Sequence, residues 1–223
     1  LLSGDPIFPG RRKMVRVRAQ RRLENSLRRY GFCHIAGVDE VGRGCLAGPV
    51  VAAAVILDPT KHIPGLRDSK LTTISERERL YKIIISSAVA WSVAAGTPEE
   101  IDNINIQQAS LEAMRSSVTR LVPLPDMVLV DAFQIPGLLI AQQGVVHGDQ
   151  KCSVIAAASI VAKVTRDREM LKHHIADPRY GYDKHKGYAT AEHLKAVSRF
   201  GYSSLHRKSF RPRSLLDVLN KDS

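Results

Sequence analysis

Residues 35–51 read Ile-Ala-Gly-Val-Asp-Glu-Val-Gly-Arg-Gly-Cys-Leu-Ala-Gly-Pro-Val-Val, and this stretch decides the fold. An apolar run delivers two adjacent carboxylates, Asp39 and Glu40, and a Gly-Arg-Gly turn then leads into a second apolar run, residues 50–57. Short apolar runs with β-branched residues are typical of buried strands. Neighbouring side chains on a strand point to opposite faces, so the two acids cannot both point into the core. A carboxylate held in a buried sheet costs free energy unless it is paired or binds a cation, and the stretch therefore predicts a metal site.

The same residues also have an ordinary interpretation. Acids that end a strand and a Gly-X-Gly turn that reverses the chain are common, and the turn alone favours that interpretation. Residues 37–51 as a whole, however, closely resemble the first signature of the ribonuclease HII family, endonucleases that act at RNA–DNA junctions. Residues 148–167 resemble the second signature of this family, and Asp131 stands in the place of its third acid, after the apolar residues 127–130. The resemblance extends over most of the chain, from about Leu23 to Phe210.

Asp131 and Asp149 each follow an apolar run. Taken singly, either acid would more often cap a helix or a turn than bind a metal. The resemblance implies instead that Asp39, Glu40, Asp131 and Asp149 are the catalytic and metal-binding acids. Like charges this close repel one another unless cations bind, and carboxylate oxygens suit Mg²⁺ or Mn²⁺. In the family, two such ions about 4 Å apart support hydrolysis of the phosphodiester 5′ to a ribonucleotide, leaving a 3′-hydroxyl and a 5′-phosphate.

Contacts to the substrate follow from the same resemblance. Gly42, Arg43 and Gly44 would give main-chain contacts to the ribose 2′-hydroxyl, because a glycine turn permits close approach of the backbone; Arg43 could equally be a general phosphate clamp. Tyr188, in a Gly-Tyr motif, would pack its ring against the deoxyribose that follows the ribonucleotide. A fifth acid, Asp167, is expected to form an i,i+4 ion pair on a helix rather than to join the site. Three more residues lie near the substrate by resemblance, although a solvated loop or a helix cap explains them as well: Ser69, Lys70 and Asn105.

The distribution of charge points to a polyanionic partner. The chain has 223 residues and a formal net charge of +11, with a hydrophobic fraction of 44% that is ordinary for a globular protein. Residues 1–30 carry a net charge of +7 and residues 204–223 carry +3, which leaves only +1 for the 173 residues between them. Cationic ends beside a nearly neutral body favour binding to nucleic acid. A solubilising tail is the alternative.

The pattern of apolar runs predicts an α/β layer fold with a mixed sheet. Three strands at 33–41, 50–57 and 91–96 would form a meander, followed by alternating helices and strands. The resemblance implies a ribonuclease H-like sheet flanked by helices, with a helical C-terminal extension beside the substrate groove. The other expected elements are helices at 14–30, 75–87, 106–121, 153–174, 190–199 and 213–220, and short strands at 127–130 and 138–141.

We expect three parts along the chain. Residues 1–30 would be a basic N-terminal extension, poorly ordered up to residue 13 and then helical. Residues 31–175 would form the ribonuclease H-like catalytic core. Residues 176–223 would form the C-terminal helical part that binds substrate.

The cysteines and the apolar runs bear on location. Cys33, Cys45 and Cys152 are odd in number and form no Cys-X-X-Cys pair, which fits a reducing cytoplasm. No apolar run approaches the roughly 20 residues of a membrane span, and no secretory signal is evident at the start of the sequence. We therefore expect a cytoplasmic monomer that binds RNA–DNA hybrids and ribonucleotide-containing duplex DNA. Recruitment by a sliding clamp has no signal in the sequence.

Two other functions stay open at this stage. A related ribonuclease H-like nuclease of broader hybrid specificity would share the acids, although the Gly-Arg-Gly and Gly-Tyr motifs argue against it. A non-enzymatic nucleic-acid-binding module would use the basic ends of the chain. Four intact acids near a phosphate would weaken such binding, which makes the module the poorer alternative.

Overall fold

A computed structural model of the chain describes residues 21–67 and 69–210. The basic segment 1–20, Asp68 and the helix expected at 213–220 lie outside the described residues. Among the helices within that range, none combines the length and the apolar character that crossing a membrane requires.

The core is a five-stranded sheet with the strand order β3-β2-β1-β4-β5. Its first three strands are β1 (Ile35–Val41), β2 (Val50–Ile56) and β3 (Ala90–Gly96), which pair antiparallel in chain order and confirm the predicted meander. β4 (Met127–Asp131) pairs parallel with β1, and β5 (Ala141–Val145) pairs parallel with β4. The carboxyl ends of β1, β4 and β5 therefore meet at one edge of a mixed sheet.

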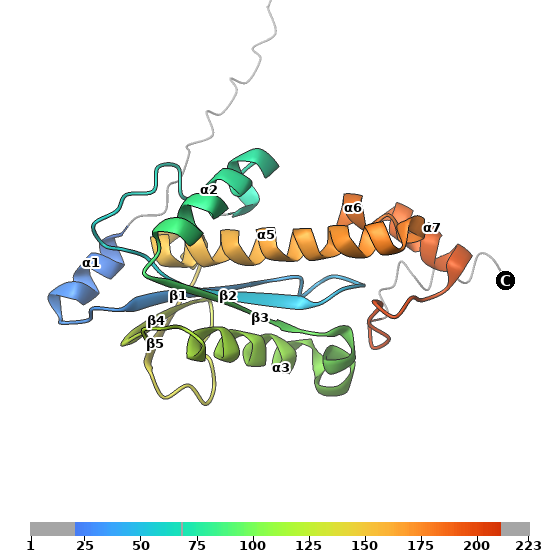
Figure 1. Cartoon of the computed structure of the whole chain (residues 1–223). Coiled ribbons are helices and arrows are strands. Elements are labelled where there is room, and N and C mark those ends of the chain that lie inside the picture. Colours follow the sequence, from blue (N-terminus) through green and yellow to red (C-terminus); the bar gives the residue numbers. More distant parts are fainter. Residues whose placement is uncertain (1–20, 68, 211–223) are drawn as a thin grey trace, which may run out of the picture.

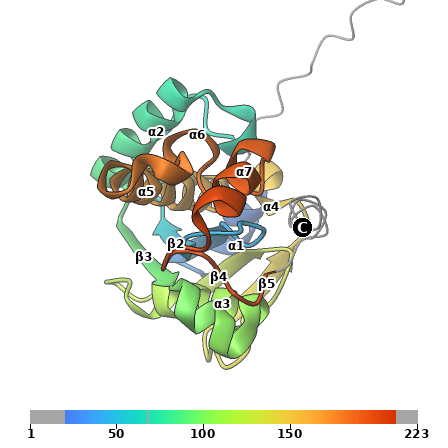
Figure 2. The same cartoon turned by 90° about the vertical axis from the view of Figure 1, so that its right-hand side faces the viewer.

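Helices cover both faces of this sheet (Figures 1 and 2). α5 (Ser153–Ala176) and α2 (Ile74–Ser87) lie on one face, and α3 (Pro98–Thr119) lies on the other. α5 approaches β1 so closely that a Cβ at Gly37 would lie 2.1 Å from the backbone carbon of Val154. The small residues near the start of α5, which are fully buried, permit this approach. They are Ala156, Ala157 and Ala158.

Short helices complete the chain. α1 (Arg22–Arg29) precedes β1, a 3-10 turn spans Ser69–Leu71, and α4 (Gly148–Lys151) comes directly before α5. A C-terminal helical part lies at the far end of α5 (Figure 1). It consists of a 3-10 turn at Pro178–Tyr180, α6 (Tyr182–His185) and α7 (Ala191–Phe200). The α/β class, the mixed sheet and the helical C-terminal part are confirmed.

Two elements differ from the prediction. The helix expected from residue 106 begins about two turns earlier, at Pro98, because Thr97 and Glu100 form a capping box there. Asn105 interrupts α3 with a φ of 67°, and its side-chain oxygen accepts hydrogen bonds from the backbone N–H groups of Gln107 and Gln108. The predicted capping role of Asn105 is therefore confirmed within a longer helix.

The strand expected at 138–141 is wrong by several residues. The fifth strand is Ala141–Val145, which lacks apolar periodicity because it forms an exposed edge of the sheet. The Gln142 side chain turns back and bonds both the N–H and the carbonyl oxygen of Ile135, at 2.7 and 2.9 Å. These bonds hold the residues before the strand in a loop.

Candidate active site

Two of the predicted acids end neighbouring parallel strands. Val38 of β1 pairs with Val130 of β4, so the residues that follow them, Asp39 and Asp131, come side by side at the sheet edge. The Asp39 residue is only 8% exposed. The register of one strand pair therefore brings together residues that are far apart in the sequence.

Asp39 and Glu40 diverge from β1, as the strand alternation predicted. The Asp39 carboxylate lies on the α5 face, where it is hydrogen-bonded to the Ser159 hydroxyl and accepts a bond of 2.8 Å from the backbone N–H of Glu40. The Glu40 carboxylate meets Arg43, with 3.4 Å between Oε1 and Nη1. Arg43 in turn donates a hydrogen bond to the side chain of Gln107 on α3.

Asp149 enters from α4 rather than from the end of a strand. The backbone N–H of Gly148 donates a hydrogen bond of 2.8 Å to Asp131 Oδ1, which fixes the turn just before Asp149. A Cβ at Gly148 would lie 2.5 Å from Ile155 Cδ1 and 3.3 Å from Asp131 Oδ1, so a larger residue there would have to displace these side chains. Asp149 is 4% exposed and lies 3.8 Å from Lys70 Nζ.

The acids at this edge repel one another. Burial raises the pKa of Asp39 well above its ordinary value, and the charges of Glu40 and then Asp131 raise it further, against the bonds from Ser159 and the Glu40 N–H. Burial likewise raises the pKa of Glu40, while Arg43 acts in the opposite direction. A cation at this edge would relieve the repulsion between these carboxylates.

The donor set suits a hard divalent cation, because it consists of carboxylate oxygens. Among the residues that the structure describes, no three Asp, Glu, His or Cys side chains are already grouped as a cage for a metal ion. Mg²⁺ commonly binds through one or two carboxylates while keeping several waters and taking substrate phosphate oxygens, so a finished cage is not required. The residues therefore fit the metal that the sequence predicts.

The two motifs expected to read the ribose lie against each other. The N–H groups of Leu46 and Ala47, just after the Gly-Arg-Gly turn, donate hydrogen bonds of 2.9 and 3.2 Å to the carbonyl oxygen of Gly187. The next residue, Tyr188, is 41% exposed, and its hydroxyl is hydrogen-bonded to the buried Cys45. Its exposure agrees with the predicted position on the surface.

The three remaining predicted contacts are placed differently from one another. Ser69 is buried, and its hydroxyl lies 2.9 Å from that of Ser159, so it contacts the group that supports Asp39. The Lys70 side chain is 81% exposed and extends to Asp149. Asn105 is exposed, with its oxygen engaged in capping. Contacts of these residues with substrate stay predictions.

The structure adds residues that the sequence reasoning missed. Ser159 and Gln107 support Asp39 and Arg43 through hydrogen bonds. The Phe133 ring lies under the Arg43 guanidinium, 5.7 Å from centroid to Cζ. Arg207 is fully buried beneath the Gly-Arg-Gly turn. Neither helical periodicity nor a sequence motif reveals such contacts, since each contact joins segments that are far apart in the sequence.

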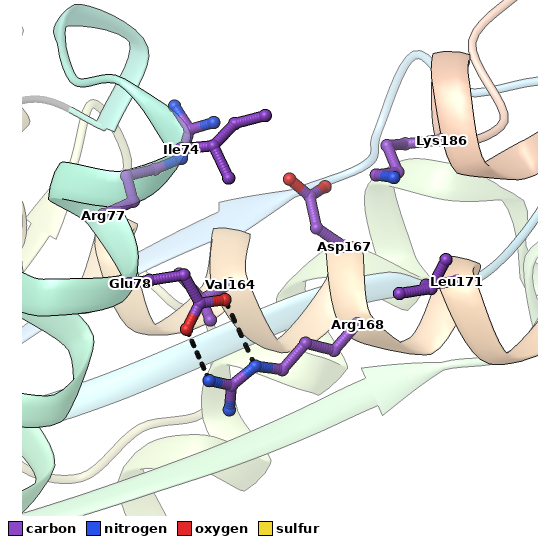
Figure 3. A pocket seen from close by; sticks show the side chains of 8 residues that line it. All are labelled: Ile74, Arg77, Glu78, Val164, Asp167, Arg168, Leu171 and Lys186. Atoms are coloured by element: carbon purple, nitrogen blue, oxygen red, sulfur yellow. Dashed lines mark hydrogen bonds and ion pairs between the residues drawn. The ribbon is translucent and has the colours of Figure 1, made fainter.

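A pocket of about 140 Å³ lies between α2 and α5 (Figure 3). Its main ion pair joins Arg168 Nη2 to Glu78 Oε2 at 2.6 Å. Asp167, which also lines the pocket, bonds Lys163 at 2.7 Å in the predicted i,i+4 pair. None of the four candidate acids lines this pocket, so it is not the active site.

Comparison with known proteins supports the sequence resemblance. The family model described as Ribonuclease HII matches residues 36–212. A ribonuclease HII of Coxiella burnetii is 52% identical over 178 residues, 80% of this chain and 88% of that protein. One of Desulfitobacterium hafniense is 47% identical over 205 residues, 92% of this chain and 79% of that protein.

Solved structures share the fold. The ribonuclease H2 of Pyrococcus horikoshii superposes with a TM-score of 0.70 at 24% identity, over 85% of this chain and 98% of that one. A complex of PCNA with ribonuclease HII from Archaeoglobus fulgidus gives 0.68 at 26% identity, over 81% of this chain and 96% of that one. Bst-RNase HIII in complex with Mn²⁺ gives 0.64 at 20% identity, over 84% of this chain and 70% of that one.

Proposed function

This chain belongs to the ribonuclease HII family, and we propose that Asp39, Glu40, Asp131 and Asp149 form its active site. The protein is an endoribonuclease that hydrolyses the RNA strand of RNA–DNA hybrids. The observation that carries the site assignment is the parallel register of β1 and β4, which puts Asp39 beside Asp131 at the sheet edge. Asp149 is linked to the same edge through the bond from Gly148 to Asp131.

The four carboxylates would hold the divalent cations, Mg²⁺ or Mn²⁺, in this proposal. Bound there, two ions would activate a water and stabilise the leaving oxygen of an in-line displacement at phosphorus. The solved complex of Bst-RNase HIII holds Mn²⁺, and the same ion is a reasonable probe for this chain.

The protein's own groups position these acids. The Ser159 hydroxyl orients the Asp39 carboxylate, and the Gly148 N–H orients that of Asp131. Arg43 balances the charge of Glu40 and holds it against α3 through Gln107. Asp39 and Asp149 are buried, so their carboxylates are poorly hydrated and a bound cation would stabilise their charge.

The substrate would lie across the acids and the adjoining Gly-Arg-Gly and Gly-Tyr motifs. Main-chain groups of residues 42–44 would contact the 2′-hydroxyl, and the exposed Tyr188 ring would pack on the next deoxyribose. This arrangement favours a cut on the 5′ side of a single ribonucleotide in duplex DNA. The Archaeoglobus fulgidus relative was solved with PCNA, and recruitment of this chain by such a clamp rests on that relative alone.

Cleavage of a labelled DNA duplex with one ribonucleotide tests the proposal. With Mg²⁺ or Mn²⁺ the full chain should cut 5′ to the ribonucleotide, and EDTA should abolish the cut. Asp39→Asn should lower kcat by at least about 10³-fold, since it removes a charged ligand at the reacting centre. Asp167→Asn is the matched control because it alters an acid that pairs with Lys163 outside the site, and it should retain activity.

Two results would count against the site. Equal loss in both variants would show that folding, not ligation, is affected. An active Asp39→Asn enzyme would exclude Asp39 from the metal site. Cleavage confined to long RNA–DNA hybrids would keep the site and remove the single-ribonucleotide specificity.

A further inference from the structure

Within the part of the chain that the structure describes, the buried Arg207 side chain donates hydrogen bonds only to backbone oxygens. It is fully buried and follows α7 in the C-terminal part. Its guanidinium donates hydrogen bonds of 2.6 Å to the Gly42 carbonyl, 2.8 Å to that of Arg43, and 3.0 and 2.8 Å to that of Gly48. Within the described residues, no carboxylate forms an ion pair with it. Burial lowers its pKa only to about 10, so it stays charged at neutral pH.

The Arg207 guanidinium bonds the carbonyl oxygens of two consecutive residues, Gly42 and Arg43, and so fixes the orientation of two peptide planes. In a trans peptide the N–H points away from the carbonyl of the preceding residue. With the Gly42 and Arg43 carbonyls turned toward Arg207, the N–H groups of Arg43 and Gly44 point to the opposite side. In the described part of the chain neither of these N–H groups donates a hydrogen bond. They form a pair of free donors next to Glu40, which Arg43 contacts.

The two glycines of the turn have different surroundings, and the difference shows where the turn is open to a ligand. A Cβ at Gly42 would lie 2.3 Å from Arg166 Nε, and its φ is +92°. A Cβ at Gly44 would meet nothing within 4 Å, and its backbone is not in the left-handed region. The protein itself therefore requires glycine at 42 but not at 44. A bare backbone at residue 44 suits close approach of a ligand.

We propose that Arg207 is a positioning residue that turns the N–H groups of Arg43 and Gly44 toward the 2′-hydroxyl oxygen of the ribonucleotide. This inference rests on the proposed function. Two N–H donors suit any acceptor oxygen, so a phosphate oxygen is the competing ligand. The proposal commits to the hydroxyl, because the pair adjoins the turn that meets Tyr188, where a ribose and its following deoxyribose would lie.

The test compares the binding of two duplexes that differ in one hydroxyl. The Kd of the full chain is measured by fluorescence anisotropy in EDTA for an all-DNA duplex and for the same duplex with one ribonucleotide. The variants are Arg207→Lys, which keeps the charge but loses the fork, and Gly44→Ala, which fills the bare space. Arg120→Lys is the control, because that arginine donates to the Val93 carbonyl elsewhere on the surface. Melting temperatures are measured for each.

The expected result is a loss of ribose preference alone. In Arg207→Lys and Gly44→Ala the ratio of the two Kd values should fall by about tenfold, the effect of one or two lost hydrogen bonds, with the all-DNA Kd unchanged. Arg120→Lys should keep the wild-type ratio.

Other results overturn the inference. An equal weakening for both duplexes would assign the donors to phosphate, and an unchanged ratio in a folded Arg207→Lys would remove Arg207. If Arg207→Lys does not fold, a wild-type ratio of the two Kd values in Gly44→Ala still refutes the claim that the N–H groups of Arg43 and Gly44 face the 2′-hydroxyl. A wild-type chain that cuts 5′ to the ribonucleotide but binds both duplexes equally refutes only this inference. A chain that does not cut at all refutes the proposed function.

Discussion

At the scale of single residues, the two glycines of the Gly-Arg-Gly turn have different structural roles. Gly42 has a positive φ and lies against Arg166, whereas Gly44 has open space around it. Gly42→Ala should therefore lower the melting temperature by several degrees, because backbone strain and a clash with the buried guanidinium both oppose it. Gly44→Ala should leave the melting temperature within about one degree. Differential scanning fluorimetry of the two variants checks this, and equal melting temperatures would contradict it.

Ser159 is the residue through which α5 supports the metal site. Its hydroxyl bonds the Asp39 carboxylate and lies 2.9 Å from that of Ser69. Ser159→Ala should raise the Mn²⁺ concentration for half-maximal cleavage by roughly tenfold, as expected when an outer partner of a ligand is removed. Ser110→Ala is the control, since Ser110 is also buried but its hydroxyl has no hydrogen-bond partner among the described residues. A Ser159→Ala enzyme with an unshifted Mn²⁺ dependence would show that Asp39 does not need this support.

The sequence was informative for residues whose chemistry is local. Asp39 and Glu40 diverge as strand alternation requires, and Asn105 caps as its residue type suggests. Asp149 was expected where a strand stops, yet it lies in a helical turn that a bond between Gly148 and Asp131 fixes. Such a bond depends on packing between distant segments, so a linear pattern does not contain it.

At the scale of elements, α1 is attached to the core through Glu24. This glutamate is fully buried, and its Oε1 accepts a hydrogen bond of 3.2 Å from the Val154 N–H at the start of α5. Burial is the main reason that its pKa is raised, and bonds from the first N–H groups of α5 oppose the rise. An acid at this place caps a helix from outside the helix's own sequence.

Removing this cap should cost stability. Glu24→Ala should lower the free energy of unfolding by about 1 to 2 kcal/mol, because it leaves buried N–H groups without an acceptor. Glu24→Gln should cost less, since it keeps an acceptor oxygen. Asn25→Ala, at an exposed position of the same helix, should change the free energy by less than about 0.5 kcal/mol. Urea unfolding of the three variants measures this, and an unaffected Glu24→Ala would show that α1 contributes no stability through the cap.

Element boundaries followed the apolar pattern where strands are buried and departed from it at edges. β2 is buried along its whole length and lies within one residue of its prediction. β5 consists of exposed and partly buried residues, and its polar glutamines interrupt the apolar run that would predict a strand. The start of α3 at Pro98 is set by the capping box of Thr97 and Glu100 rather than by the spacing of apolar residues.

At the scale of the whole molecule, three histidines connect elements of the C-terminal part to the Gly-Tyr motif at Tyr188. The Ser203 N–H donates to His206 Nδ1, so the His206 Nε2–H faces His193 Nε2 at 3.1 Å. The His193 Nδ1–H then donates to the Tyr188 carbonyl at 2.9 Å. His185 stacks on His193, with 4.3 Å between the ring centroids. This chain of bonds requires neutral rings.

Acid should therefore loosen the C-terminal part. Burial lowers the pKa of both His193 and His206 to about 4, below the ordinary value near 6.5. Between these values the unfolded chain binds more protons, so stability is complete above about pH 6.5 and falls as the pH drops toward 4. The melting temperature should fall by roughly 5 to 10 °C from pH 7.5 to pH 4.5.

His206→Asn supplies the comparison, because its side-chain oxygen can still accept from Ser203 while only one of the two titrating rings, that of His193, is left. The loss of melting temperature between the two pH values should be smaller in this variant than in the wild type. His62→Asn, at an exposed position, should show the wild-type loss. The same pH dependence in all three proteins would mean that acid acts elsewhere.

The charge of the whole chain is concentrated at its ends, and this separates affinity from specificity. Residues 1–13 hold Arg11, Arg12 and Lys13 against Asp5, while the 173 residues between the two basic ends carry a net charge of only +1. Cations that meet phosphates release counterions, so each contributes up to about 0.9 to the slope of log affinity against log salt.

Deleting residues 1–13 should weaken binding to an all-DNA duplex at about 50 mM salt and leave it unchanged near 0.5 M, where charges are screened. The ribose preference should stay the same, because residues 42–44 and Tyr188 lie in the body of the chain. The full-length chain with Arg11, Arg12 and Lys13 replaced by Gln separates charge from length, and it should match the deletion. A deletion that weakens binding equally at both salt concentrations would instead show that this segment makes contacts other than electrostatic ones.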